Sequence, residues 1–276
     1  MLSFPASFFN WPDGWQCRTA GSGRSGAGRT FRPPMRLAGA GPRPHCQAMT
    51  ASLRDIGVWI FDLDNTLYPA SCNLFAQVDR RIGDFIADHF GISFDEARAM
   101  QKRFFREHGT TLRGLMVEHD VDPVPFLDYV HDIDVTPVAP CPDLADALDR
   151  LPGRKVIYTN GSVQHAANVT ARLGIAGHFD TVFGIVEAGY VPKPDPRPYV
   201  TLVERHGIDP KKACMVEDIA RNLVPAHAMG MTTVWVRSEA EWSRPDPSIP
   251  GGGVGTGSHI DHTVDDLVAW LGEVAG

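Results

Sequence analysis

The sequence lacks the features that would indicate a membrane protein or a nucleic-acid-binding protein. No uninterrupted apolar stretch among its 276 residues approaches the roughly 18 residues needed to span a bilayer. The formal net charge is -7, whereas a surface that binds nucleic acid needs an excess of Lys and Arg. We therefore expect no membrane partner and no macromolecular nucleic acid. A small anionic ligand is still allowed, because one or two local cations suffice to bind it.

The sequence also lacks any cysteine pattern. There is no CxxC pair and no Cys/His spacing of the kind that binds a metal. The five cysteines are scattered, at Cys17, Cys46, Cys72, Cys141 and Cys214. An odd, unpatterned set is typical of reduced thiols, so we predict a cytoplasmic protein.

Residues 1–48 lack lysine and an amphipathic period, and Asp13 is their only acidic residue. A segment so rich in Gly, Arg, Pro and Ser is not expected to build a packed core. We interpret it either as a disordered leader or as a mis-annotated start, with translation beginning in fact at Met49. The alternatives are an Arg-rich organelle transit peptide and a weak RNA-contacting tail.

From Val58 onward, short apolar runs alternate with helical patterns. Strands are predicted at Val58–Phe61, Val156–Tyr158, Cys214–Val216 and Thr233–Val236. Helices that end at a glycine are predicted at Ser162–Leu173, Pro196–His206 and Asn222–Met229. This alternation predicts an α/β fold, in which a doubly wound, mostly parallel sheet carries helices on both faces.

Residues 70–136 interrupt the alternation with helical patterns alone. Apolar positions between Leu74 and Phe90 fall on one helical face. Ser93 and Glu96 form a capping-box signature for a second helix, and shorter helices are predicted at 112–118 and 126–131. We expect a small all-helical cap domain over residues 70–136, inserted into a core made of residues 49–69 and 137–276.

Residues 238–258 are rich in Pro and Gly without the spacing of a nucleotide-binding loop. We predict a flexible connection there. A final helix is predicted at Val264–Leu271.

Two carboxylates, Asp62 and Asp64, directly follow the first predicted strand in the string FDLDNT. Two residues apart on an extended chain, they point in roughly the same direction at the carboxyl edge of the sheet, where open α/β sheets bind ligands. Close carboxylates repel each other, so the pair suits a divalent cation or a shared proton. A solvated turn at the strand end is the alternative interpretation.

Polar groups also follow the second predicted strand and occupy a loop further along the chain. Thr159, Asn160 and Gly161 precede a helix and offer hydrogen-bond donors to a phosphate, although a plain N-cap at Ser162 explains them as well. Lys193 stands between two prolines, which restrict the backbone and fix where its ammonium points.

Glu217 and Asp218 close another apolar strand. Mg²⁺ prefers hard oxygen ligands in octahedral geometry. Asp62, the backbone carbonyl of Asp64 and Asp218 are candidate ligands, with Glu217 either a ligand or directly behind them. Asp218 alone is equally compatible with a helix N-cap.

In this order, the strings DLDNT, TNG, KPDP and EDIARN resemble the four motifs of the haloacid dehalogenase-like hydrolase superfamily. The resemblance extends from about Val58 to the C-terminus. The helical insertion looks like the type-one cap of that superfamily. The string DLDNTLYP and the helix after it are similar to the pyrimidine 5'-nucleotidase branch.

This resemblance implies a Mg²⁺-dependent phosphatase. Asp62 would be the nucleophile that forms an aspartyl-phosphate, and Asp64 the general acid and then the general base. Thr159 and the amides of Asn160 and Gly161 would hold the phosphate oxygens, with Lys193 opposite. The cap would close over the site and exclude bulk water.

The expected substrate is a small phosphorylated metabolite. The branch resemblance favours a nucleoside monophosphate, UMP or CMP, and phosphoglycolate and sugar phosphates are alternatives. Asp64 argues against a haloacid dehalogenase, because a halide leaving group needs no general acid. A phosphomutase would keep every motif. From a different class, a non-catalytic binding protein that retains the fold is the remaining alternative.

Overall fold

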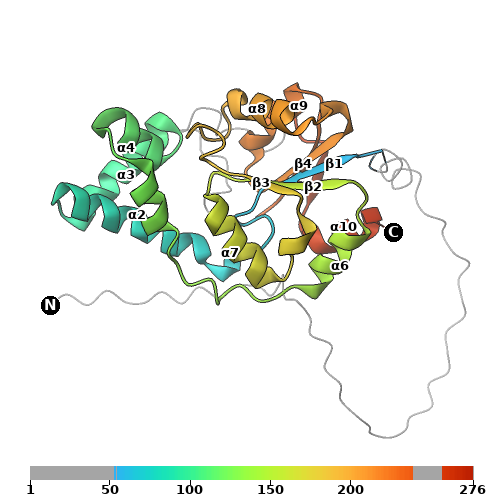
Figure 1. Cartoon of the computed structure of the whole chain (residues 1–276), viewed down its shortest axis with the longest axis horizontal. Coiled ribbons are helices and arrows are strands. Elements are labelled where there is room, and N and C mark those ends of the chain that lie inside the picture. Colours follow the sequence, from blue (N-terminus) through green and yellow to red (C-terminus); the bar gives the residue numbers. More distant parts are fainter. Residues whose placement is uncertain (1–52, 54, 239–256, 276) are drawn as a thin grey trace, which may run out of the picture. The chain divides into compact units, whose positions relative to one another are not determined.

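The computed structural model describes residues 53, 55–238 and 257–275 (Figure 1). The predicted leader, residues 1–48, lies outside the described residues, as does most of the predicted connection 238–258. No helix within the described ranges is long and apolar enough to cross a membrane.

Six strands of the described chain form one sheet in the order β3-β2-β1-β4-β5-β6. They are β1 (Val58–Phe61), β2 (Arg154–Tyr158), β3 (Thr181–Phe183), β4 (Ala213–Glu217), β5 (Thr232–Val236) and β6 (His262–Val264). All neighbouring strands run parallel. The central strand β1 pairs on one side through Val58↔Arg154 and on the other through Val58↔Ala213. The residues that follow β2, β1 and β4 therefore meet at one edge of the sheet.

Helices cover both faces of this sheet (Figure 1). One face carries α8 (Pro196–His206) and α9 (Leu223–Ala228), and the other carries α6 (Pro142–Arg150), α7 (Val163–Leu173) and α10 (Leu267–Ala275). Strands covered on both faces need apolar side chains at consecutive positions, and all four residues of β1 are buried. The predicted doubly wound α/β fold is confirmed.

One predicted boundary is wrong. Val264 ends strand β6, and the last helix begins only at Leu267; β6 pairs with β5 through Val234↔His262, which fixes this segment as extended chain. The helix predicted from about Asn222 to Met229 is α9, Leu223–Ala228, and it follows a 3₁₀ turn at Ala220–Asn222. Helix α6 and the short strands β3 and β6 had no strong pattern and were not predicted.

Four α-helices lie between β1 and α6 in the chain, and we call them the cap. They are α2 (Leu74–Phe90), α3 (Phe94–His108), α4 (Thr111–His119) and α5 (Pro123–Val130). They share a hydrophobic core of their own, separate from the core at the sheet. The predicted capping box starts α3, since Glu96 Oε2 accepts a 2.9 Å hydrogen bond from the Ser93 backbone. The exact domain boundaries at 70 and 136 stay a prediction.

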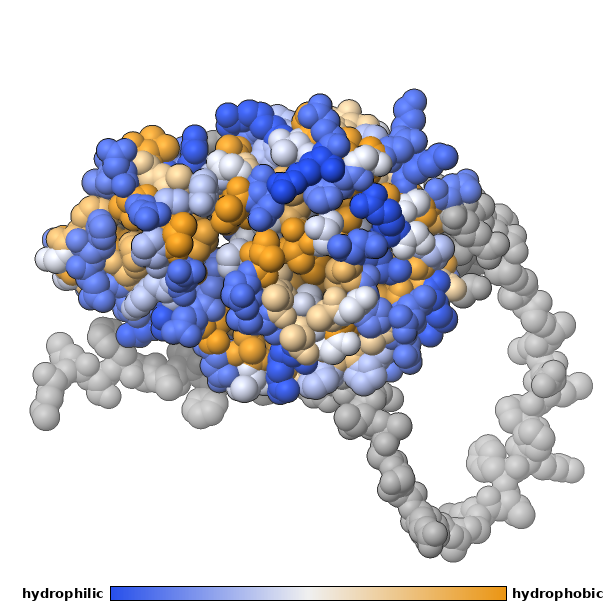
Figure 2. Space-filling model, viewed as in Figure 1, coloured by the Kyte–Doolittle hydropathy of each residue, from blue (hydrophilic) through white to orange (hydrophobic). Residues whose placement is uncertain are grey.

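The cap contacts the sheet-bearing core at several points. Ile185 and Tyr190, which follow β3, pack into the cap's hydrophobic cluster. Phe105 of α3 lies 5.7 Å from the guanidinium of Arg221. In Figure 2 the viewed face is largely hydrophilic, and several of its hydrophobic residues gather near the middle, where the cap adjoins the sheet in Figure 1.

Candidate active site

The carboxyl edge of the sheet brings the predicted site residues together. Asp62 follows β1 directly, and its backbone N–H donates a 2.9 Å hydrogen bond to the carbonyl of Val216 in β4. Thr159 follows β2, and Glu217 and Asp218 stand at the end of β4. Residues far apart in the sequence therefore meet because their strands are neighbours.

Lys193 is the centre of the hydrogen-bond network at this edge. Its Nζ donates to Asp62 Oδ1 at 2.7 Å, to Glu217 Oε1 at 2.8 Å and to the carbonyl of Tyr158 at 3.1 Å. An ammonium has three N–H donors, and all three are used. Its side chain is 2% exposed. Burial alone would lower the pKa of Lys193, but Asp62 and Glu217 raise it, so these two carboxylates favour its ammonium form.

Asp62 is fixed from two sides. Lys193 binds one carboxylate oxygen, and the hydroxyl of Thr66 donates to the other at 2.8 Å. Burial raises the pKa of Asp62 to about 7 against the effect of Lys193, with Glu217 and Asp64 adding to the rise. Burial and the neighbouring Glu217 also raise the pKa of Asp218. One buried ammonium is therefore too little positive charge for the carboxylates around it.

The same carboxylates fit a divalent cation. Ligand atoms of Asp62, Glu217 and Asp218 lie within 4.8 Å of one another. Oδ2 of Asp218 is buried and has no hydrogen-bond partner among the described residues. A buried charged oxygen without a partner is costly, and a hard cation would satisfy it.

Glu217 lies behind these ligands. Its Oε1 accepts from Lys193 and, at 2.6 Å, from the amide of Asn222, and its Oε2 accepts from the backbone of Ile219 at 2.6 Å. Both oxygens are thus engaged with the protein. Both oxygens of Asp62 are engaged as well, so Oδ2 of Asp218 is the carboxylate oxygen of this cluster best placed to face a cation.

Asp64 has two partners that the sequence did not predict. Its Oδ1 accepts from the hydroxyl of Tyr68 at 2.6 Å and is 2.7 Å from Nε2 of His165. Burial works against ionisation, but His165 and Tyr68 lower the pKa of Asp64 to about 2. A signal for both was present in the sequence. Tyr68 lies in DLDNTLYP, and a helix capped at Ser162 places His165 in its first turn.

The segment after β2 is internally bonded. Thr159 Oγ1 accepts from the backbone N–H of Gly161 at 2.9 Å, and Asn160 Oδ1 accepts from the backbone N–H of Lys193 at 2.9 Å. Ser162 caps α7, as its side chain accepts from the backbone of His165. A Cβ at Gly161 would come within 3.2 Å of the side chains of Thr159 and His165 and within 3.7 Å of Asp64 Oδ2, so glycine avoids crowding Thr159 and His165. The phosphate-binding role of these residues stays a prediction.

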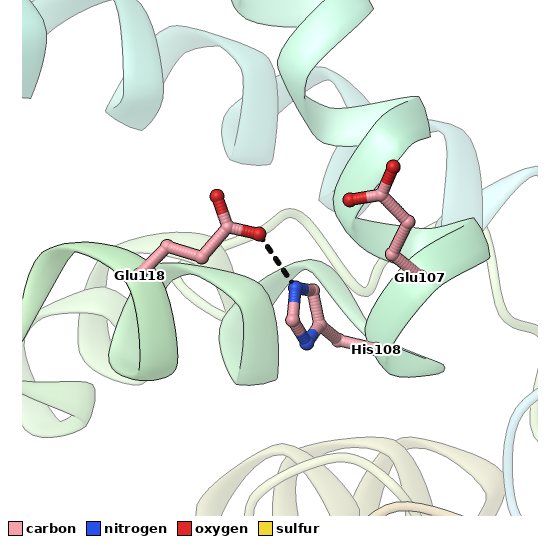
Figure 3. A group of neighbouring side chains, drawn as sticks. All are labelled: Glu107, His108 and Glu118. Atoms are coloured by element: carbon pink, nitrogen blue, oxygen red, sulfur yellow. Dashed lines mark hydrogen bonds and ion pairs between the residues drawn. The ribbon is translucent and has the colours of Figure 1, made fainter.

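A second group of metal-ligating side chains lies on the cap, at Glu107, His108 and Glu118 (Figure 3). Nε2 of His108 is 2.7 Å from Glu118 Oε1, and Arg103 donates to both oxygens of Glu118 and to Glu107. The carboxylates are exposed and already paired with a guanidinium, which would repel a cation. This group is an ion-pair network that joins α3 to α4.

Comparison with known proteins decides the family. Residues 56–230 match the family described as haloacid dehalogenase-like hydrolase. The chain belongs to the haloacid dehalogenase-like hydrolase family. This confirms the resemblance found in the sequence and the expected broad class of enzyme, a hydrolase.

Two relatives of this haloacid dehalogenase-like hydrolase are 28% identical to it. One is phosphate metabolism protein 8 of Saccharomyces cerevisiae, over 63% of this chain and 59% of that protein. The chain thus spans less than two thirds of that relative's length. The other is a glyceraldehyde 3-phosphate phosphatase of Methanopyrus kandleri, over 64% of this chain and 82% of that protein.

Solved structures share the fold. An HAD phosphatase from Thermococcus onnurineus superposes with a TM-score of 0.54 at 20% identity, covering 80% of this chain and 98% of that one. CbbY from Rhodobacter sphaeroides, solved in complex with phosphate, superposes with a TM-score of 0.53 at 16% identity, covering 79% and 96%. At these identities the likeness concerns the fold alone.

Proposed function

We propose that this haloacid dehalogenase-like hydrolase removes phosphate from small phosphomonoesters through a covalent intermediate on Asp62, with Mg²⁺ as cofactor and pyrimidine nucleoside monophosphates as substrates. The observation that carries the proposal is the buried Asp62, held by Lys193 and Thr66 at the carboxyl edge of the sheet, with Asp64 two residues further on. A carboxylate so held is a suitable nucleophile.

In the first step a carboxylate oxygen of Asp62 attacks phosphorus, and the bond from phosphorus to the ester oxygen breaks. Asp64 gives a proton to the departing oxygen. The low pKa of Asp64 means that the free enzyme holds it ionised. An approaching anionic phosphate raises the pKa of a neighbouring carboxyl group, which favours protonation of Asp64 once substrate is bound.

In the second step Asp64 takes a proton from water, whose oxygen attacks the phosphorus of the aspartyl-phosphate. The bond from phosphorus to Asp62 breaks, and inorganic phosphate leaves. Throughout, Lys193 offsets the charge on Asp62 and the phosphate. Thr159 and the backbone of Asn160 and Gly161 line the position that the phosphate group occupies.

A cation fits beside these residues. Asp62, Asp218 and the backbone carbonyl of Asp64 would hold Mg²⁺, with Glu217 behind them. When bound, it offsets the repulsion between a carboxylate nucleophile and an anionic phosphate.

The substrate class rests on two separate observations. DLDNTLYP and the helix after it favour a pyrimidine nucleotide. A three-carbon sugar phosphate is the second candidate, because one relative is a glyceraldehyde 3-phosphate phosphatase. A cytoplasmic location stays a prediction from cysteine usage. Among the described residues, Cys72 and Cys214 are free thiols.

The test is phosphate release by the full chain with Mg²⁺ from UMP, CMP, AMP, phosphoglycolate, glyceraldehyde 3-phosphate and several hexose phosphates. Asp62→Asn should lower the rate by at least about 10⁴-fold, because it removes the nucleophile. Glu118→Gln, the same kind of change in the exposed cap network, should leave the rate unchanged.

Preference for UMP and CMP supports the nucleotidase proposal. Preference for sugar phosphates keeps the chemistry and refutes that substrate. No release from any ester contradicts the hydrolytic proposal and favours a phosphomutase or a binding protein.

A further inference from the structure

A continuous set of contacts leads from the cap to Asp64. His165, in the first turn of α7, is 1% exposed, and its Nε2 lies 2.7 Å from Asp64 Oδ1. An ionised carboxylate offers only acceptors, so Nε2 carries the proton in this bond whatever the charge of the ring. His165 is therefore a hydrogen-bond donor to Asp64.

His131 holds the other side of His165. The two rings stack, with centroids 4.7 Å apart and an interplanar angle of 16°. Nδ1 of His131 lies 3.0 Å from the hydroxyl of Ser162, the N-cap of α7. His131 follows α5, the last helix of the cap, so the cap itself supports the ring that donates to Asp64.

Tyr68 completes the arrangement from the core. Its hydroxyl donates to the same oxygen, Asp64 Oδ1, at 2.6 Å. Two donors on one oxygen fix the plane of the carboxyl group. Both of these contacts use Oδ1, and the other oxygen, Oδ2, lies 3.7 Å from the position that a Cβ at Gly161 would take. That oxygen is left for proton transfer.

We propose that His165 positions the carboxyl group of Asp64 for proton transfer, together with Tyr68, and that His131 holds His165 in place only while the cap is docked on the core. The orientation of the acid–base group then depends on cap closure. This inference rests on the proposed function, because it takes Asp64 to be the general acid.

Such a role has a kinetic signature that a purely structural role lacks. A general acid matters most when the leaving oxygen is strongly basic, as in an alkyl phosphate. It matters little for p-nitrophenyl phosphate, whose phenolate leaves without a proton. The ratio kcat/KM reports the steps up to departure of the leaving group. Loss of Asp64 positioning should therefore lower kcat/KM for the alkyl ester selectively.

The experiment compares His165→Leu with His165→Gln in the full chain. Leucine fills similar space without a donor, whereas glutamine keeps an N–H at a similar reach. His165→Leu should lower kcat/KM by about 10–100-fold for the best alkyl ester from the panel and by less than about threefold for p-nitrophenyl phosphate. His165→Gln should restore most of the loss. Equal losses on both esters, or a glutamine variant as poor as the leucine variant, would overturn the proposal.

Tyr68→Phe serves if His165→Leu does not fold, since it removes the second donor and keeps the ring. It should show the same selective loss, and a uniform loss counts against the proposal.

For the cap, His131→Ala should reproduce the selectivity more weakly than His165→Leu. An unchanged ratio of kcat/KM between the alkyl ester and p-nitrophenyl phosphate would refute the role of His131. Wild-type chain without activity on any ester overturns the proposed function and this inference together, whereas an active wild type with uniform losses overturns this inference alone.

Discussion

Two acidic clusters in this chain have a similar composition and opposite surroundings. Asp62, Glu217 and Asp218 lie at the edge of the sheet and are at most 6% exposed. Glu107, His108 and Glu118 lie on the cap, where both glutamates are exposed. Each cluster has one basic partner with a long side chain, Lys193 in the first and Arg103 in the second.

The difference lies in what remains unsatisfied. Arg103 and His108 supply hydrogen bonds to both oxygens of Glu118, and water reaches the rest. In the buried cluster Lys193 donates to Asp62 and Glu217, and Oδ2 of Asp218 has no hydrogen-bond partner in the part of the chain that the structure describes. Proximity of acidic groups alone does not mark a metal site. A buried charge that the protein leaves unpaired is a stronger indication of a metal site.

The largest expected effect comes from removing each cluster's cation. Lys193→Met leaves Asp62 and Glu217 buried without their ammonium, and should lower the free energy of unfolding by about 3–5 kcal/mol. Arg103→Met is the matched change at the surface and should cost far less, because water solvates the freed carboxylates. Urea unfolding measures both variants, and similar losses would show that burial does not distinguish the clusters.

Metal addition should give the next largest effect. At Mg²⁺ concentrations a hundredfold above Kd, binding to the folded chain should stabilise it by about 2.7 kcal/mol, a rise in Tm of roughly 5–10 °C. Asp218→Asn should abolish this rise, and without Mg²⁺ it should be no less stable than wild type. Glu118→Gln should keep the full rise. A Mg²⁺ response lost in Glu118→Gln instead would place the metal on the cap.

The smallest expected effect is a change in thermal stability that is lost at low pH. Hydrogen bonds from Arg103 and His108 lower the pKa of Glu118 to about 2. A carboxyl group whose pKa is lower in the folded than in the unfolded chain stabilises the fold. The stabilisation is fully present at pH values above the ordinary pKa of 4.5 and is lost as the pH falls toward the folded-state value of about 2. Glu118→Gln should therefore lower Tm by only about 1–2 °C at pH 7, and the difference should vanish near pH 2. Thermal melts across this range check it, and a difference that grows in acid would contradict it.

The sequence was sufficient to predict the strands that hold the site. Val58–Phe61 is an uninterrupted apolar run followed by acids, and the structure has that strand with the same bounds. Strands β3 and β6 have only three residues each, too few for a periodic pattern. They are strands because a neighbour in the sheet pairs with them, and that information is not local.

His165, one of the two partners of Asp64, escaped prediction for the same reason. In the sequence, nothing distinguishes His165 from the other positions of an amphipathic helix. Only the pairing of β1 with β2 brings its side chain next to Asp64. The stack of His131 on His165 depends further on how the cap docks. The order of the motifs predicted which residues gather at the sheet edge. The hydrogen bonds among them needed the structure.

The position of the cap between β1 and β2 has a consequence for how the chain folds. Both neighbours of β1 lie far along the chain, β2 beyond the whole cap and β4 further still. Closing such long loops costs entropy before any strand pairing repays it. The cap helices have local contacts and a core of their own, so we expect them to form early and to shorten the effective loop between β1 and β2. Asp62 then reaches Lys193 only when the sheet is complete, so catalytic competence should be among the last properties the folding chain acquires.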